Sequence, residues 1–279
     1  MRAPAKINLS LDVLGRRPDG YHALRSVMQT LDVHDTLELS PDPTGALTLT
    51  CDAPALIGPT NLAWRAADLL RQETGYTDGA RLTLRKRVPV DAGLGGGSSD
   101  AAAALLGLNR LWGLGLSIER LAVLGARLGS DVPFFFYAPT ALATGRGETV
   151  ASLPPLPRVH VVLYKPDSGV STRQVFAALT PALYSDGSRT EALLATLRAD
   201  PPLPPDRWPL SNDLQRTVRL LYPAVARALD ALRDAGASNP LMTGSGSTCY
   251  ALFPDEDDAR RVHERLSGAG GWTALTSTT

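Results

Sequence analysis

A glycine-rich segment, VPVDAGLGGGSSDAAAALLGLNRLWGL at residues 88–114, constrains the fold of this chain more than any other feature. Four glycines, at positions 93, 95, 96 and 97, stand directly before two serines and a run of alanines. Glycine loses the most backbone freedom on folding, so such a cluster needs a physical reason. A glycine loop between a strand and a helix leaves unpaired N–H groups at the positive end of the helix. The segment therefore predicts an anion site at the start of a helix from about Ser98 to Trp112.

Two common phosphate-binding motifs do not fit this loop. A P-loop ends in Gly-Lys-Ser/Thr, whereas this loop ends in Gly97-Ser98-Ser99-Asp100 and has no lysine. A dinucleotide fingerprint needs three spaced glycines at the start of a βαβ unit. Here Ser98 stands where the third glycine belongs, and strand-like segments precede the loop. A tight turn with no ligand is the simpler alternative.

Composition narrows the class of protein. The chain has 279 residues with zero formal net charge, 44% hydrophobic and 20% charged residues, which predicts a globular protein of one large or two ordinary domains. Without a basic surplus or an apolar run of about 20 residues, we expect no nucleic-acid partner and no membrane. The N-terminus has no secretory character, and Cys51 and Cys249 are far apart, so we expect reduced thiols and a cytoplasmic protein. The histidines and cysteines have no metal-ligand spacing, so no protein-held metal site is expected.

The order of predicted elements favours an α+β fold. Alternation predicts a half-buried strand over 7–13, and further strands are expected at 36–40, 46–51, 81–88, 158–164 and 248–253, with a final strand near the end. Helices are expected over 61–75, with Asn61 as the N-cap, over 117–129, 211–235 and 255–266, and around 171–179. The proline-rich LPPLPR segment suggests a boundary between domains 1–155 and 156–279, and a second proline-rich loop is expected at 200–209.

Several polar residues are candidates for a site. Lys6 shares one strand face with Asn8, Ser10 and Asp12, although a lysine near the start of an edge strand is usually a solvated charge. Asp131 precedes an apolar Val-Pro-Phe-Phe-Phe run, where a carboxylate needs a polar partner. The simpler alternative is a turn aspartate whose side chain bonds its own backbone.

Two further segments could contribute to that site. Tyr21 and His22 follow a turn, where they could stack on and hydrogen-bond a base or simply face solvent. A second loop of small residues leads into a strand and could form another wall of a phosphate pocket; its residues are Thr243, Gly244, Ser245, Gly246 and Ser247.

Four of these segments, PAKINL, VPVDAGLGGGSSDAA, GSDVPFFF and MTGSGST, resemble in order the motifs of the GHMP small-molecule kinases. The resemblance extends from residue 3 to about residue 253. It implies two α+β domains, an N-terminal ribosomal-protein-S5-like domain and a C-terminal ferredoxin-like α/β plait, with the active site between them. It also implies ATP and Mg²⁺ as cofactors, and a monomer or a homodimer.

Within this superfamily, APAKINLSLDVLGRRPDGYH resembles the kinases whose substrate carries a cytidine diphosphate group. The resemblance implies phosphorylation of the 2-hydroxyl of a methylerythritol unit, a step of the non-mevalonate route to isoprenoids. It implies that Asp131 is the catalytic base and that Lys6 polarises the hydroxyl and keeps Asp131 ionised. It implies that Tyr21 and Phe176 sandwich the cytosine and that His22 bonds its edge.

The resemblance assigns the remaining site residues as well. Asn8 and Thr172 match further substrate contacts. The matched ATP-binding residues are Pro89, Val90, Asp91, Ala92, Gly93, Leu94, Gly95, Gly96, Gly97, Ser98 and Ser99 in the loop, and Asn61, Leu62 and Lys86 on the adenosine side. Arg146 stands where apolar residues are common in the family, near the expected substrate cleft. It could contact the substrate diphosphate or face solvent, and we expect it to face solvent.

Three other functions remain open on the sequence. One is another GHMP kinase, such as a homoserine or mevalonate kinase, whose substrates carry no base for Tyr21 and His22. Another is a nucleotide-binding protein without catalysis, which the presence of both Lys6 and Asp131 disfavours. The last is a dinucleotide-dependent oxidoreductase, which the broken fingerprint disfavours.

Overall fold

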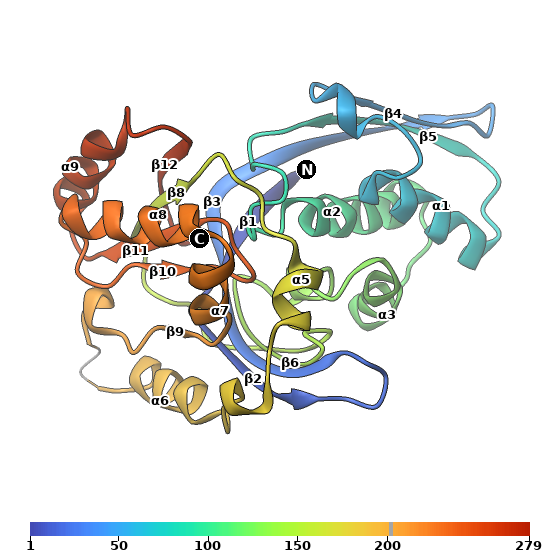
Figure 1. Ribbon diagram of the computed structural model, residues 1–279. Helices are drawn as coiled ribbons and strands as arrows, with labels where there is room; N and C mark the ends of the chain where they lie inside the picture. The colour runs from blue at the N-terminus through green and yellow to red at the C-terminus, as the bar shows by residue number, and fades with distance from the viewer. Residues whose placement is uncertain (201–202) are drawn as a thin grey trace.

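The computed structural model describes residues 1–200 and 203–279 and shows an α+β protein with two β-sheets (Figure 1). The larger sheet has eight strands: β1 (Arg2–Asn8), β2 (Ser10–Arg16), β3 (His22–Asp42), β4 (Leu47–Cys51), β5 (Gly79–Arg85), β6 (Thr140–Gly145), β7 (Thr149–Ser152) and β9 (Ser211–Asn212). The smaller sheet has four: β8 (His160–Lys165), β10 (Leu241–Met242), β11 (Cys249–Phe253) and β12 (Trp272–Ser277).

The helices fall into two groups by sequence. The first half contributes α1 (Leu62–Thr74), α2 (Gly96–Leu111), α3 (Ile118–Leu128) and α4 (Phe134–Tyr137). The second half contributes α5 (Thr172–Ala177), α6 (Ser188–Leu197), α7 (Leu214–Leu221), α8 (Pro223–Asp234) and α9 (Glu256–Leu266). Short 3-10 helices lie at η1 (Pro54–Leu56), η2 (Pro181–Leu183) and η3 (Pro205–Arg207).

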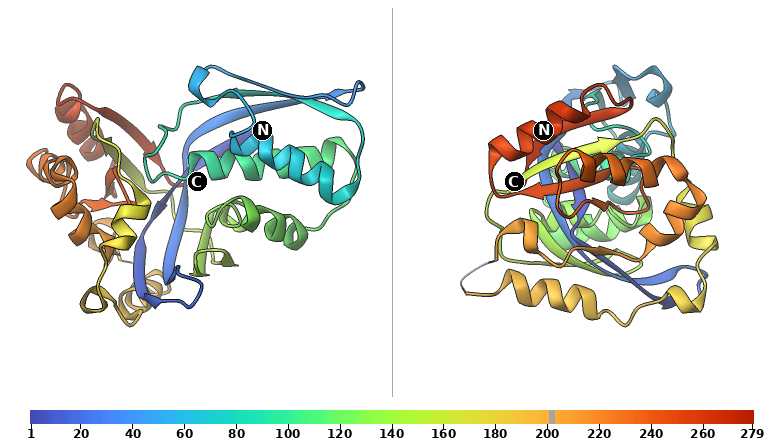
Figure 2. Two further views of the ribbon diagram at one scale, coloured as in Figure 1. Left: turned by 45° about the vertical axis from the view of Figure 1, so that its right-hand side comes forward. Right: turned by 60° about the vertical axis from the view of Figure 1, so that its left-hand side comes forward.

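The strand β3 organises the larger sheet. It runs for 21 residues and pairs antiparallel with β1, β2, β5 and β6 at different points along its length. It curves through the middle of the molecule in Figure 2, with α1, α2 and α3 on one side and the smaller sheet on the other. The predicted strand at 36–40 is therefore one part of a much longer strand.

Helix α2 lies close against this sheet because its inward residues are small. Ala101 to Ala104 are buried, and a Cβ on Gly107 would come within 2.3 Å of Leu39 Cδ1. Helix α1 begins at the predicted N-cap Asn61, whose side chain accepts the Ala63 N–H at 2.8 Å. These contacts fix the first turn of α2, where the glycine loop ends, relative to the sheet.

The two sheets pack against each other through a shared core. Along β8, Val161 and Leu163 face the larger sheet, where they join Ile7 and Val27. The alternate residue Val162 packs with α7, α8 and α9 on the other face. A strand buried on both faces reads as a continuous apolar run, and the strand predicted over 158–164 has such a run from Val161 to Tyr164.

Two predictions about regular structure are wrong. The expected single helix over 211–235 is a two-residue strand, β9, followed by α7 and α8, because Pro223 begins a new helix and cannot continue the old one. The expected single half-buried strand over 7–13 is the end of β1 and the start of β2, and its polar face is buried as well. In β2, Asp12 accepts the Thr190 N–H at 2.8 Å from the covering helix α6.

The proposed domain boundary between residues 155 and 156 stays a prediction. The strand β9 comes from the second half of the chain and pairs in parallel with β2. The predicted loop at 200–209 includes residues 201 and 202, which lie outside the described residues. Within the described ranges, no helix is long and apolar enough to cross a bilayer.

Candidate active site

A cleft of about 1450 Å³ brings most of the predicted site residues together. Both halves of the chain line it. The residues predicted from sequence that line it are Lys6, Asn8, Tyr21, His22, Asn61, Leu62, Lys86, Pro89, Val90, Asp91, Ala92, Gly93, Gly95, Gly96, Gly97, Ser98, Asp131, Thr172, Phe176, Gly244, Ser245 and Gly246. Leu94 and Ser99 belong to the same loop but are buried, each with 1% exposure.

The glycine loop forms one wall of this cleft and is shaped by contacts with protein atoms. Gly93 and Gly95 have φ values of +76° and +69°, a region that favours glycine. A Cβ on Gly93 would lie 2.6 Å from the Thr243 carbonyl oxygen and 2.8 Å from that of Gly246. A Cβ on Gly95 would lie 2.9 Å from Lys6 Cγ. Two of the glycines are thus explained by the second loop and by Lys6, without any ligand.

The end of the glycine loop presents free donors to the cleft. Helix α2 begins at Gly96, and its first backbone bond across the cap is from the Ser99 N–H to the Gly95 carbonyl at 2.9 Å. Within the described part of the chain, no backbone acceptor takes the N–H groups of Gly96, Gly97 or Ser98. These three donors line the cleft at the positive end of a 16-residue helix, which suits an anion.

The second loop packs directly against the first. The Thr248 N–H donates to the Ala92 carbonyl at 3.2 Å, and Thr243 Oγ1 lies 3.5 Å from the Gly93 carbonyl oxygen. On its other side, the Ser245 hydroxyl bonds the Thr172 hydroxyl at 2.7 Å at the start of α5. The structure therefore connects the two loops and α5 into one wall.

Lys6 and Asp131 form an ion pair at the centre of the cleft. The Lys6 Nζ lies 3.4 Å from Asp131 Oδ2, and the two side chains are 3% and 38% exposed. Lys6 is therefore not a solvated edge-strand charge. Asp131 contacts a cation across the cleft, so its carboxylate faces the open space with a buried positive charge behind it.

Asn8 holds the Lys6 ammonium group in place. The Lys6 Nζ donates to Asn8 Oδ1 at 2.7 Å, and Asn8 Nδ2 donates to Ser26 Oγ at 2.8 Å. The Thr243 hydroxyl adds a bond to Asn8 Oδ1 at 3.2 Å. Both ends of the Asn8 amide are therefore used within the protein, and its part as a substrate contact stays a prediction.

Aromatic side chains line the other end of the cleft. Tyr21 is 55% exposed, whereas His22 is buried between two rings. The His22 ring centroid lies 5.2 Å from that of Phe176 and 5.7 Å from that of Tyr184, whose hydroxyl is 3.3 Å from His22 Nε2. Burial and the charge of Arg16 lower the pKa of His22, so its ring is neutral at pH 7.

Lys86 lies between two buried carboxylates under the glycine loop. Its Nζ is 2.5 Å from Asp35 Oδ2 and 2.7 Å from Asp100 Oδ2. Asp35 also accepts the N–H groups of Arg87 and Val88. Burial raises the pKa of Asp100 to about 7, with Lys86 opposing the shift. Contacts with Asp35 and Asp100 thus largely compensate the positive charge of Lys86 inside the protein.

The expectation that Arg146 faces solvent is wrong. Its side chain lines the cleft and is 30% exposed, and its guanidinium carbon lies 4.8 Å from the centroid of the Tyr21 ring. The glycines on both sides of Arg146 allow the tight turn that directs it inward, because Gly145 and Gly147 have φ values of +72° and +107°.

Sequence reasoning missed three residues near the site: Asp35, Asp100 and Tyr184. Asp100 carried a usable signal, since a carboxylate among the alanines of a predicted buried helix needs a compensating charge. Asp35 and Tyr184 carried none, because their contacts with Lys86 and His22 span 51 and 162 residues.

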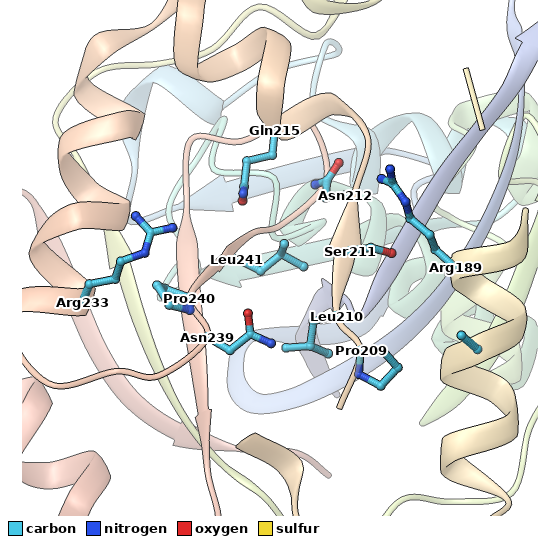
Figure 3. A pocket seen from close by; sticks show the side chains of 11 residues that line it. Arg189, Pro209, Leu210, Ser211, Asn212, Gln215, Arg233, Asn239, Pro240 and Leu241 are labelled. Carbon is cyan, nitrogen blue, oxygen red and sulfur yellow. The ribbon is translucent and has the colours of Figure 1, made fainter. Parts of the chain in front are cut away.

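A smaller pocket of about 470 Å³ lies away from this cleft, between α6, β10 and α8 (Figure 3). Arg189 and Arg233 lie on opposite sides of it. Each is paired with a carboxylate, Arg189 with Asp213 at 2.6 Å and Arg233 with Asp230 at 2.7 Å. None of its lining residues lines the larger cleft.

Known proteins are similar to this chain in sequence and in fold. The family models for the GHMP kinases N terminal domain and the GHMP kinases C terminal domain match residues 61–138 and 206–271. The 4-diphosphocytidyl-2-C-methyl-D-erythritol kinase of Pelotomaculum thermopropionicum is 45% identical over 94% of this chain and 92% of that protein. That of Geobacter sp. strain M21 is 42% identical over 98% and 95%.

A crystal structure of a 4-(cytidine 5'-diphospho)-2C-methyl-D-erythritol kinase agrees with these sequence matches. It superposes with a TM-score of 0.86 at 37% identity and covers 100% of this chain and 98% of its own. The chain therefore has the two-domain GHMP kinase fold and is an ATP-dependent kinase of that superfamily. Within the superfamily, it belongs to the family of the 4-diphosphocytidyl-2-C-methyl-D-erythritol kinases.

Proposed function

We propose that this kinase transfers the γ-phosphoryl group of ATP to the 2-hydroxyl of 4-diphosphocytidyl-2-C-methyl-D-erythritol, in the non-mevalonate route to isoprenoids. The observation that carries the proposal is the Lys6–Asp131 ion pair, with its 3.4 Å separation, in a cleft that has free N–H donors along one wall and aromatic rings at another part. The wall of N–H donors suits phosphates, and the aromatic rings suit a base. The Lys6–Asp131 pair can act on a hydroxyl held between them.

The proposed reaction gives Asp131 and Lys6 separate tasks. The 2-hydroxyl donates its proton to the Asp131 carboxylate, while its oxygen forms a bond to the γ-phosphorus and the bond from that phosphorus to the β–γ bridging oxygen breaks. The Lys6 ammonium group stabilises the negative charge on the reacting oxygen. Its bonds to Asp131 and Asn8 fix its position before the substrate binds.

The triphosphate is proposed to bind along the glycine loop. The N–H groups of Gly96, Gly97 and Ser98 would bond phosphate oxygens, with no change of conformation required in α2. Asn61 and Leu62 are proposed to lie on the adenosine side, where both line the cleft. The Asn61 amide already caps α1 and donates to the Leu56 carbonyl at 2.9 Å, so it would contribute contact surface.

The substrate is proposed to bind with its cytosine between Tyr21 and Phe176. His22 fits the task of bonding the base edge because its ring is neutral and lies beside Phe176. Thr172 contributes a hydroxyl from the second wall.

Mg²⁺ is the metal ion expected with ATP. No cluster of three or more acidic, histidine or cysteine side chains suitable for a metal occurs among the described residues. This fits Mg²⁺, which usually takes one or two protein ligands and otherwise phosphates and water. The Ser98 hydroxyl lines the cleft beside the free N–H groups and would supply one such ligand. The ion would neutralise phosphate charge. We also propose a cytoplasmic monomer or homodimer.

A coupled ADP-release assay tests this proposal. The purified chain, ATP and magnesium are mixed in turn with the cytidine substrate, homoserine and mevalonate. We expect turnover with the cytidine substrate alone. Turnover with another alcohol would reject the substrate assignment, and no turnover with any of the three would favour a nucleotide-binding protein without catalysis.

A further inference from the structure

The turn that carries Arg146 lies beside both functional ends of the cleft. It joins β6 to β7 and closes with a bond of 3.0 Å from the Gly147 N–H to the Thr144 carbonyl. The Arg146 guanidinium covers one face of the Tyr21 ring at 4.8 Å. A Cβ on the next residue, Gly147, would lie 4.0 Å from Asp131 Oδ1. Arg146 therefore lies between the aromatic rings and the reacting carboxylate.

Glu148 fixes the direction of this arginine. Its carboxylate accepts the Arg146 backbone N–H at 2.5 Å and lies 3.4 Å from Arg146 Nε. Gly145 leaves room for that carboxylate, since a Cβ there would come within 2.7 Å of Glu148 Oε2. Glu148 thus holds both the backbone N–H and the Nε of Arg146. In the described ranges, neither terminal nitrogen of Arg146 has a hydrogen-bond acceptor.

The other cations of the cleft are less suited to bind an anion at this point. Lys6 and Lys86 have a single charged nitrogen each, and it already contacts a carboxylate at 3.4 Å or less. Arg146 contacts Glu148 at 3.4 Å through Nε alone, which leaves its two terminal nitrogens for a ligand. Arg16 and Arg173 line the cleft but are exposed, so solvent and salt screen their charges. Arg146 is half-buried and presents two free donor groups, the arrangement that recognises phosphate oxygens in pairs.

We propose that Arg146 is the diphosphate-binding residue of the acceptor site: its terminal nitrogens bond the substrate's diphosphate between the cytosine and the reacting hydroxyl. This inference rests on the proposed function, which places a base at Tyr21 and a hydroxyl at Asp131. A diphosphate joins those two groups in the substrate and must cross the space beside Arg146. The guanidinium would bond the diphosphate while it stacks on one face of Tyr21, leaving the other face of the ring for the base.

Binding of cytidine and of cytidine diphosphate, measured by calorimetry, tests the inference. The two ligands share the base and differ in the diphosphate, so the ratio of their dissociation constants isolates the contact to the phosphates. The variants are Arg146→Ala, Arg146→Lys and the matched control Arg173→Ala, which removes an exposed arginine from the same cleft. Circular dichroism of each variant checks its folding, and Arg146→Lys keeps the test usable if Arg146→Ala does not fold.

We expect Arg146→Ala to weaken cytidine diphosphate about tenfold or more and cytidine less than twofold, since a hydrogen bond to a charged group is worth about 1.5–3 kcal/mol. Arg146→Lys should recover part of the loss, and Arg173→Ala should change the ratio little. An unchanged ratio in Arg146→Ala, or an equal loss in Arg173→Ala, would overturn the inference alone. If neither ligand binds the unsubstituted chain, the base site in the proposed function is wrong, and this inference fails with it.

Discussion

The two ends of the cleft present different groups to a ligand, backbone N–H groups at one end and side chains at the other. The proposed phosphate end is formed by Gly96, Gly97 and Ser98, whose backbone N–H groups face the cleft. The side chains behind them are buried and paired, and Lys6 and Asp100 are 3% and 2% exposed. At the proposed base end, the side chains of Tyr21, His22 and Phe176 line the cleft, and Tyr21 is 55% exposed. The phosphate end is thus fixed by the fold, whereas the base end depends on a few surface residues.

This difference separates catalysis from specificity. Backbone donors at the start of α2 would bind the phosphates of ATP whatever alcohol is phosphorylated. The base end offers rings and an arginine that only a substrate with a base and a diphosphate would use. Substitutions at the phosphate end should therefore affect turnover or folding, and those at the base end should affect acceptor binding.

The largest expected effect is on turnover, from Asp131→Asn. The variant keeps the shape of the side chain but removes the base, so kcat should fall about a thousandfold. The dissociation constant of ATP, measured by calorimetry, should stay within about twofold. A large loss of ATP affinity with a modest loss of kcat would make Asp131 a structural residue and contradict its assigned role.

The next effect is on folding, from Gly93→Ala compared with Gly97→Ala. A Cβ at Gly93 meets two carbonyl oxygens of the second loop at 2.6 and 2.8 Å with φ at +76°, so the free energy of unfolding should fall by about 3 kcal/mol. A Cβ at Gly97 meets only Leu62 Cδ1 at 3.4 Å, and stability should change by less than about 1 kcal/mol.

Urea denaturation measures both variants, and the KM for ATP separates their causes. Gly97→Ala should raise that KM if a phosphate lies against the loop. Equal stability losses in the two variants would contradict the contact between the two loops as the reason for Gly93.

At the base end, Tyr21→Ala should weaken the acceptor alone. Loss of base stacking is worth about 1–3 kcal/mol, so the KM for the cytidine substrate should rise roughly tenfold while the KM for ATP stays unchanged. Steady-state kinetics with each substrate varied in turn gives both values. Equal increases in both would reject the base site at Tyr21 and remove the contrast between the two ends.

The smallest effect concerns pH and Asp100. Burial raises the pKa of this carboxyl from 3.8 to about 7, so the folded chain binds a proton that the unfolded chain loses. Stability from this group is full below pH 4 and declines as pH rises to about 7. The free energy of unfolding of the unsubstituted chain should fall by about 1 kcal/mol from pH 6 to pH 7, relative to Asp100→Asn. Parallel pH profiles for the two proteins would show that Asp100 does not hold this proton.

The sequence predicts the glycine loop and the helix α2 that follows it, because local signals define both. The glycine cluster, the serines and the alanines of α2 are neighbours in the chain, and each follows from helix termini and close packing. The N-cap Asn61 and the helix beginning after Ser117 are confirmed for the same reason. Even so, the need for glycine at positions 93 and 95 comes from contacts with other protein atoms, which the sequence did not indicate.

The rest of the site depends on contacts between distant residues. The direction of Arg146 depends on Tyr21, which is 125 residues earlier in the chain, so a local reading placed Arg146 in solvent. The burial of both faces of β2 depends on α6, nearly 180 residues later, and hydrophobic alternation alone indicated one exposed face. Length and periodicity also favoured one helix over 211–235, although Pro223 was visible as a breaker.

A crystal structure of the chain with its cytidine substrate and a non-hydrolysable ATP analogue would test the central claim most directly. We expect the γ-phosphate at the N–H groups of Gly96, Gly97 and Ser98, the 2-hydroxyl within hydrogen-bond distance of Asp131, and the cytosine on Tyr21. A cytosine bound at the glycine loop, or an acceptor hydroxyl out of reach of Asp131, would contradict the division of the cleft into a phosphate end and a base end.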